Sequence, residues 1–394
     1  MSTDPVTTKA PRVALLCFLV AVLEGFDLQV AGIAAPNLKL AFALDPRTLG
    51  WFFSASTFGL LIGALFGGRL ADRIGRARVL IWSVAGFGVA SILTGLAQDP
   101  ASLIGARFAT GLGLGGALPN LLAFTSENAA AGRERRAVAL LYCGVPIGGA
   151  CVSLLGAALS GDWRTPFLLG GALPLVLALA MGHSMPRDRT TQRTDVPAIG
   201  PLEALLGGGR VISSLLIWIS FFATLVILYL VLNWLPTLLT GLGLDARTAF
   251  IAQLAFNFGG LALCAVTAPL LDWPRGWLVA LGSFTAIPVL LWLASAIDTP
   301  TSAIALAFLL GGGVLVTQSY LYALAPRIYP PSARGIGVGG AVAAGRLGSI
   351  AGPLLGAALL SSGGGISSVL QGIIPVAVIA GIAAIALSLR RPGA

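Results

Sequence analysis

Twelve long apolar runs, separated by short polar segments, dominate this chain of 394 residues. Each run is close to the roughly 20 residues that an α-helix needs to cross ~30 Å of hydrocarbon. Since lipid offers no hydrogen bonds to the backbone, apolar runs of this length predict helices rather than open strands. We expect an all-α membrane protein with helices over residues 13–35, 48–70, 78–97, 101–125, 137–160, 165–185, 211–239, 246–271, 276–296, 301–325, 335–360 and 367–389.

The composition excludes several classes of protein. Hydrophobic residues make up 57% of the chain and charged residues 10%, against about 45–50% and 25% in ordinary soluble domains. The single histidine, His183, and the four cysteines lie in apolar stretches without a C-x-x-C spacing. We therefore expect no metal, no cofactor and no enzyme activity.

Basic residues are distributed unevenly between the two sides of the predicted bundle. With both termini on the cytoplasmic side, 18 of the 24 lysines and arginines fall in cytoplasmic segments and four in outer loops, while Arg107 and Arg346 lie inside predicted helices. This asymmetry follows the positive-inside rule. It predicts a multi-pass protein of the inner (plasma) membrane with cytoplasmic termini, so the net charge of +9 does not call for a nucleic-acid partner. The expected partners are the lipid bilayer and small solutes, and we expect a monomer.

The two halves of the chain repeat each other at an offset of 200 residues. The segment Leu44–Thr48 falls on Leu244–Thr248, and the run Leu154–Leu159 has an identical copy at Leu354–Leu359. We expect an N-terminal six-helix half over residues 1–185, a cytoplasmic linker over 186–210 and a C-terminal half over 211–394. Six helices return the chain to its starting side, so the repeats are parallel and related by an axis along the membrane normal.

The loop after the second predicted helix carries a glycine-acid-basic motif, Gly-Arg-Leu-Ala-Asp-Arg-Ile-Gly-Arg-Ala-Arg. It resembles the cytoplasmic signature of the major facilitator superfamily, except that Ala77 takes the place of the last basic residue. One interpretation is a positive-inside loop with an acid by chance. The other is a gate in which Asp72 pairs with nearby arginines until the halves rock apart. The second-half copy keeps an acid but loses the glycine-basic run. The gating residues predicted in this way are Gly68, Asp72, Arg73, Gly75, Arg76 and Asp272.

Two acids, Glu24 and Asp27, lie on one face in the middle of the first predicted helix. A carboxylate inside the bilayer is costly, which makes an intramembrane acid a functional candidate. Arg107 begins an Arg-x3-Gly-x3-Gly stripe in the fourth helix. We expect it to pair with Asp27 or Glu24 and the three residues to carry the coupled proton. The alternative is an ion pair that serves structure alone.

Arg346 is the other intramembrane cation, in the eleventh predicted helix. Because the buried acids belong to the first half, we expect Arg346 to lack a protein partner until an anionic substrate arrives. The alternative is a structural partner in the first helix. Pairs of polar residues four apart present amides and phenols along single helix faces, where they either contact substrate or join helices. The substrate-binding candidates are Arg346, Tyr229, Asn233, Gln253, Asn257, Gln318 and Tyr322.

Several segments resemble the aromatic acid/proton symporters of this superfamily, and most closely their 3-(3-hydroxyphenyl)propionate transporter branch. The segments that carry the resemblance are Glu24–Pro36, Leu118–Asn120, Tyr142–Gly148, Asn233–Pro236, Leu321–Pro326 and Gly339–Pro353. Many family members read Asp-Gly-Phe-Asp in the first helix, where this chain has Glu24 in place of the first acid. The resemblance implies the major facilitator fold, with a substrate site near the membrane midplane between the halves.

The resulting hypothesis is a secondary transporter that imports a small aromatic carboxylate, such as 3-(3-hydroxyphenyl)propionate or a hydroxybenzoate, together with protons. The chain has no G-x4-G-K-[ST] loop, which argues against direct drive by ATP. Two other classes stay open: a proton-coupled exporter of lipophilic drugs or aromatic compounds, and a membrane sensor that transports nothing.

Overall fold

The computed structural model describes residues 10–127, 129, 134–159, 161–184, 200–271, 277–330, 333–363 and 365–389. Within these residues the regular secondary structure is helical throughout. In this described part of the chain, twelve segments are long and apolar enough to cross a membrane, which confirms the predicted all-α membrane fold. The chain divides into two compact units, Met1–Thr191 and Gln192–Ala394.

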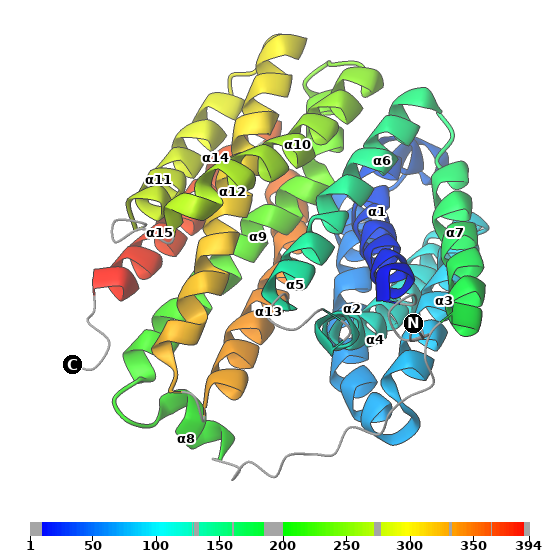
Figure 1. Cartoon of the computed structure of the whole chain (residues 1–394). Coiled ribbons are helices and arrows are strands. Elements are labelled where there is room, and N and C mark those ends of the chain that lie inside the picture. The colour runs from blue at the N-terminus through cyan, green and yellow to red at the C-terminus, as the bar shows by residue number, and fades with distance from the viewer. Residues whose placement is uncertain are drawn as a thin grey trace. The chain divides into compact units, whose positions relative to one another are not determined.

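The first unit is a bundle of long helices, coloured blue to green in Figure 1. Its helices are α1 (Ala10–Phe42), α2 (Pro46–Ile74), α3 (Arg76–Gly95), α4 (Pro100–Glu127), α5 (Glu134–Tyr142), α6 (Gly144–Ala158) and α7 (Arg164–Ser184). Its main apolar core is built mostly from α1, α3, α4 and α7.

The second unit repeats this plan after a short helix that lies within the predicted linker. Its helices are α8 (Pro201–Leu206), α9 (Val211–Gly241), α10 (Ala246–Leu271), α11 (Trp277–Ala294), α12 (Pro300–Ile328), α13 (Arg334–Ser361), α14 (Gly365–Gly372) and α15 (Ile374–Leu389). Its core draws on α9, α11, α12 and α15, the counterparts of the helices that build the first core.

Two of the predicted spans are each divided into two helices. The fifth breaks at Cys143, between α5 and α6, and the twelfth breaks at Ile373, between α14 and α15. Proline has no N–H and leaves the carbonyl four residues earlier without its helical partner. Pro146 and Pro375 lie three and two residues after these breaks, so each break lies where a proline removes a helical hydrogen bond. Proline alone does not suffice, since Pro119 and Pro236 lie inside unbroken helices.

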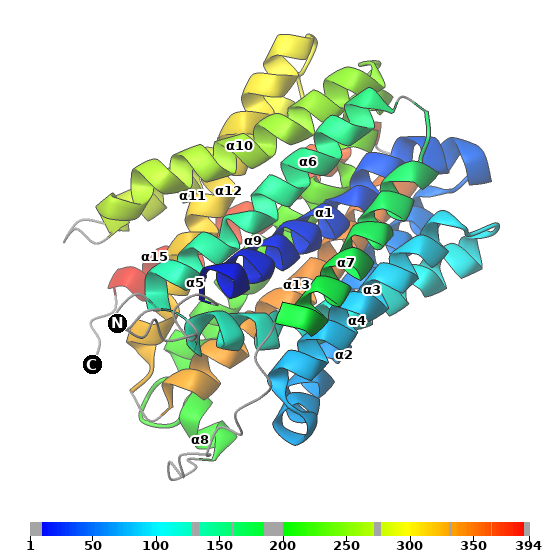
Figure 2. The same ribbon diagram turned by 45° about the vertical axis from the view of Figure 1, so that its right-hand side comes forward.

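The duplication appears in the contacts within each unit. Glycines let two helices approach so closely that a Cβ atom would overlap the facing backbone carbonyl. Gly148 of α6 faces the Val22 carbonyl of α1, and Gly348 of α13 faces the Phe222 carbonyl of α9. Figure 2 shows α1 and α6 running side by side. Two further pairs obey the same offset of 200 residues: Gly59 with Phe108 and Gly259 with Phe308, then Gly111 with Ser56 and Gly311 with Phe256.

The loops that start helices repeat as well. Asp45 accepts a hydrogen bond from the Thr48 amide at 2.8 Å, and Asp245 does the same for Thr248 at 3.2 Å. These carboxylates are exposed, and the bonds that they accept from the threonine hydroxyl and amide hold their pKa below the usual range. N-caps of this kind fix where α2 and α10 begin.

Candidate functional site

A buried ion pair joins two helices of the first unit. Arg107 of α4 donates from one guanidinium nitrogen to both carboxylate oxygens of Asp27 on α1, at 3.0 Å each. Its other terminal nitrogen donates to the Asp27 carbonyl at 3.3 Å. The two side chains are at most 2% exposed. The structure thus pairs Arg107 with one of the two acids that the sequence left open.

Glu24 lies one helical turn before Asp27 and is also buried. The hydrogen bonds of the Arg107 side chain go to Asp27 and not to Glu24. The described bonds of the Arg107 side chain thus select Asp27, and the role expected for Glu24 is not tested by them. It stays a prediction, as does the proton-coupling role of the pair.

Close helix packing brings Arg107 into this position. Gly111 and Gly115, the stripe that follows it along α4, contact the backbone of α2 at Ser56 and Leu60. Small residues at these steps let the α4 backbone approach α2 directly. As a result, the charged side chain one turn before the stripe lies inside the unit instead of facing lipid.

Two phenylalanine rings flank the Arg107 guanidinium. The Arg107 Cζ atom is 5.9 Å from the Phe52 ring centroid and 5.8 Å from that of Phe167. Phe52 belongs to α2 and Phe167 to α7, and both are fully buried. The sequence analysis missed these two residues. The comparison of the two halves contained a signal for them. At the offset of 200 residues, Phe52 corresponds to Ala252 and Phe167 to Ser367, and Arg107 corresponds to Ala307, so the rings are absent where the arginine is absent.

In the second unit, Arg346 of α13 has a neutral partner. It donates a hydrogen bond to the Tyr229 hydroxyl of α9 at 3.1 Å. The expectation that Arg346 lacks a protein partner is therefore wrong, because α9 and α13 pack closely enough to bring the phenol to it. The Asn233 amide donates to the Tyr229 carbonyl at 2.7 Å. The structure thus brings together three of the predicted substrate-binding residues, Arg346, Tyr229 and Asn233.

The other four substrate-binding candidates lie on two other helices of the second unit. Gln253 and Asn257 are buried on α10, where the Asn257 amide donates to the Gln253 carbonyl at 2.9 Å. Gln318 and Tyr322 are half-buried on α12. The Tyr322 ring packs edge-on against Phe221 of α9, with 5.1 Å between centroids. A substrate-binding role for these four stays a prediction.

The predicted gate lies where α2 ends and α3 begins. Gly75 is the single residue between the two helices and has φ of 99°, a value that favours glycine. Asp72 and Arg73 are exposed, and a side chain added at Gly68 would meet nothing within 4 Å. The structure records no ion pair for Asp72 within its described residues. Arg76 begins α3 and is half-buried, while Asp272 lies outside the described residues, so the gating role stays a prediction.

Known proteins resemble this chain along nearly its whole length. The 3-(3-hydroxy-phenyl)propionate transporter of Escherichia coli is 41% identical, over 99% of this chain and 98% of that protein. The 4-hydroxybenzoate transporter PcaK of Pseudomonas aeruginosa is 31% identical, over 96% of this chain and 93% of that protein.

Family and fold comparisons agree with these relatives. The profile of the Major Facilitator Superfamily matches residues 17–343. The solved structure of the nucleoside transporter NupG has the same fold, with a TM-score of 0.80 at 12% identity over 95% of this chain and 99% of that chain. The predicted family is thereby confirmed: this multi-pass membrane protein belongs to the major facilitator superfamily, in the family of its aromatic acid transporters.

Proposed function

We propose that this protein imports a small aromatic carboxylate together with protons across the inner membrane, with both termini in the cytoplasm. The substrate is of the type of 3-(3-hydroxyphenyl)propionate or a hydroxybenzoate. Relatives named as transporters of these two acids support the class of solute. The uneven distribution of basic residues between the two sides supports the orientation.

The observation that carries the proposal is the Asp27–Arg107 pair. A buried carboxylate inside the membrane needs a partner, and a single arginine supplies it here at 3.0 Å. Proton binding to Asp27 neutralises the acid and weakens the pair, while release of the proton restores it. A carboxyl that alternates between these states can carry a proton through the transport cycle.

Arg346 is proposed to bind the substrate carboxylate. An anion that leaves water needs a cation to offset its desolvation. The planar guanidinium can hold both carboxylate oxygens and stays charged at any working pH. Arg346 donates a hydrogen bond to the Tyr229 hydroxyl, and a substrate carboxylate can displace or share this bond. Asn233 orders the same turn of α9 through its bond to the Tyr229 carbonyl.

Accumulation in cells tests the proposed function. Cells that express the protein are given labelled 3-(3-hydroxyphenyl)propionate, with and without an uncoupler. A proton-driven importer concentrates the acid, and the uncoupler abolishes the concentration. An uncoupler that raises the cellular level would indicate an exporter. A level equal to that of cells without the protein would contradict transport of this acid.

The substrate role of Arg346 has its own test. A charge-assisted hydrogen bond contributes about 1.5–3 kcal/mol, so Arg346→Gln should weaken binding of the acid at least about tenfold. Binding of the neutral amide analogue should change little. Arg346→Lys should recover little, because an ammonium group cannot reproduce the planar fork. Arg327→Gln, at an exposed arginine of the same unit, is the matched control. If Arg346→Gln keeps the wild-type preference for the acid over the amide, Arg346 does not bind the carboxylate.

A further inference from the structure

The Arg107 guanidinium is enclosed by aromatic rings as well as by its acid. The Phe52 and Phe167 centroids lie 5.9 and 5.8 Å from its Cζ atom, near the ~6 Å limit within which a ring face attracts a cation. The two rings are also close to each other, with centroids 6.4 Å apart. They come from α2 and α7, whereas the ion pair joins α1 and α4.

The two rings stabilise the part of the guanidinium that the described hydrogen bonds do not reach. Among the described residues, the buried Arg107 Nε atom has no hydrogen-bond partner. The described bonds of the guanidinium all run toward one residue, Asp27, on one side. When Asp27 takes up a proton, this attraction weakens. In the described part of the chain, the Phe52 and Phe167 ring faces then still favour a cation at this place.

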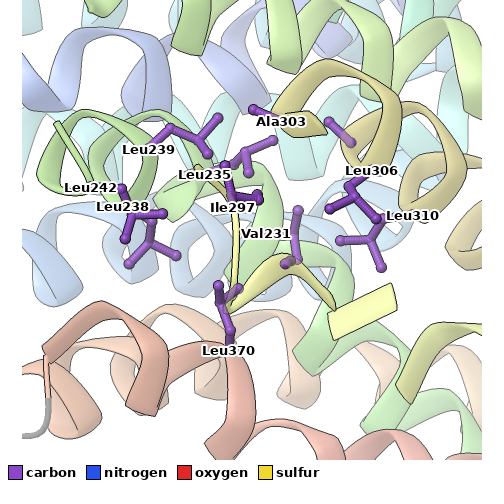
Figure 3. Close-up of a pocket in the computed structure, with 12 residues that line it drawn as sticks. Val231, Leu235, Leu238, Leu239, Leu242, Ile297, Ala303, Leu306, Leu310 and Leu370 are labelled. Carbon is purple, nitrogen blue, oxygen red and sulfur yellow. The ribbon is translucent and has the colours of Figure 1, made fainter. Parts of the chain in front are cut away.

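The second unit shows what the same place looks like without the ion pair. At the offset of 200, Arg107 corresponds to Ala307 and Asp27 to Ile227. Phe52 and Phe167 correspond to Ala252 and Ser367, so acid, arginine and both rings are replaced together. Ala307 lines an apolar pocket between α9, α11, α12 and α14, shown in Figure 3. The residues around that pocket are Val231, Leu235, Leu238, Leu239, Leu242, Ala294, Ile297, Ala303, Leu306, Ala307, Leu310 and Leu370.

We propose that Phe52 and Phe167 are positioning residues, which clamp the Arg107 guanidinium on Asp27 and thereby set the pH range in which the protein transports. The effect on pH rests on the proposed function, in which Asp27 carries the proton. The clamp itself does not, because it is a physical coupling between the two rings and a cation. The two claims can therefore fail separately.

A double-mutant cycle measures the clamp without any transport assay. Phe52→Leu is made in the wild type and in the variant Asp27→Asn/Arg107→Gln, which lacks both charges, and unfolding is followed with denaturant in mixed micelles. The ring should stabilise the charged protein more, by a coupling of about fivefold to thirtyfold in the unfolding equilibrium. Phe167→Leu should behave alike, and Phe52→Tyr, which keeps the ring, should show most of the wild-type coupling.

Phe87→Leu is the matched control, because Phe87 is an equally buried phenylalanine of the same unit with its side chain in the apolar core. Phe87→Leu should lower the free energy of unfolding by the same amount in the wild type and in the variant that lacks both charges. If the Phe52 and Phe167 costs are also equal in both, the rings act only by filling space and the proposal is overturned.

The pH profile of uptake gives the second readout. Loosening Arg107 favours the protonated acid, so the pH of half-maximal uptake should move upward by about one unit in Phe52→Leu and Phe167→Leu. Glu24 is the other acid of α1 near this site, while the membrane-embedded parts of α2, α3, α6 and α7 carry no charged side chain. The charged residues of α5, which also contacts α1 and α4, are Glu134, Arg135 and Arg136 at its start. The shift should therefore persist in a Glu24→Gln background. If the double-mutant cycle shows the coupling but uptake shows no pH shift, the clamp is supported and Asp27 is not the proton carrier.

Discussion

Replacing either member of the Asp27–Arg107 pair should destabilise the first unit more than replacing both. Arg107→Gln leaves a carboxylate in a site where both side chains are at most 2% exposed, and it removes two hydrogen bonds of 3.0 Å. Breaking a buried ion pair from one side costs about 3–5 kcal/mol, because a charge is left without its partner. Asp27→Asn should have a cost of similar size, since it strands the guanidinium.

The double variant Asp27→Asn/Arg107→Gln leaves no charge behind. It should therefore be more stable than Arg107→Gln alone, by about 2 kcal/mol or more. The loss of stability caused by Arg107→Gln should also become smaller as the pH falls, because protonation of Asp27 removes the negative charge that has no partner. The assay is the free energy of unfolding from denaturant titration in mixed micelles at two pH values.

Arg164→Gln provides the control. Arg164 is an exposed arginine of the same unit that lies over the Trp163 ring, with 4.5 Å from Cζ to the centroid. Its side chain also donates to the Gly95 carbonyl at 3.2 Å, so its loss should cost about 1–2 kcal/mol, less than that of either member of the buried pair. The reasoning is refuted if the single variants cost no more than this control and the double variant shows their simple sum.

Two further predictions concern the gate and the helix packing. Asp72→Asn should slow transport in every mode, including exchange without net proton movement, and Asp272→Asn should do less because its surrounding motif is eroded; equal rates in a counterflow assay would argue against a specific latch. Gly348→Ala should lower the free energy of unfolding by about 1–3 kcal/mol, since its Cβ would overlap the Phe222 carbonyl. Gly282→Ala, where a Cβ meets nothing within 4 Å, should not, and similar costs at both sites would contradict the close helix contact.

The helices could be predicted because lipid imposes a length and an apolar composition on each span. The residues at which the helices end were harder to predict. The first span was expected to stop at residue 35, yet α1 continues through Pro36 and Lys39 to Phe42. Hydropathy marks the part of a helix that lies in hydrocarbon, whereas the helix itself can continue beyond it. At the end of α1 the Leu44 amide donates to the Lys39 carbonyl at 3.1 Å, which supplies one of the last carbonyls with a partner.

In the candidate site, too, some residues could be predicted from the sequence and others could not. Asp27 and Arg107 stand out in sequence because a charge inside the bilayer is costly. The Arg346–Tyr229 bond could not be predicted, since it depends on the register of α9 against α13. Phe52 and Phe167 differ from their second-half counterparts Ala252 and Ser367, but the sequence does not relate this difference to Arg107 until the place of the arginine is known.

The most direct test of proton coupling uses purified protein in liposomes. Uptake of labelled 3-(3-hydroxyphenyl)propionate is measured with an acidic exterior, in wild type and Asp27→Asn, and exchange of the same acid is measured without a gradient. Wild type should concentrate the acid inside, and the concentration should collapse with a proton ionophore. Asp27→Asn should lose gradient-driven accumulation while it stays folded in the membrane. Full proton-driven accumulation by Asp27→Asn would contradict the account.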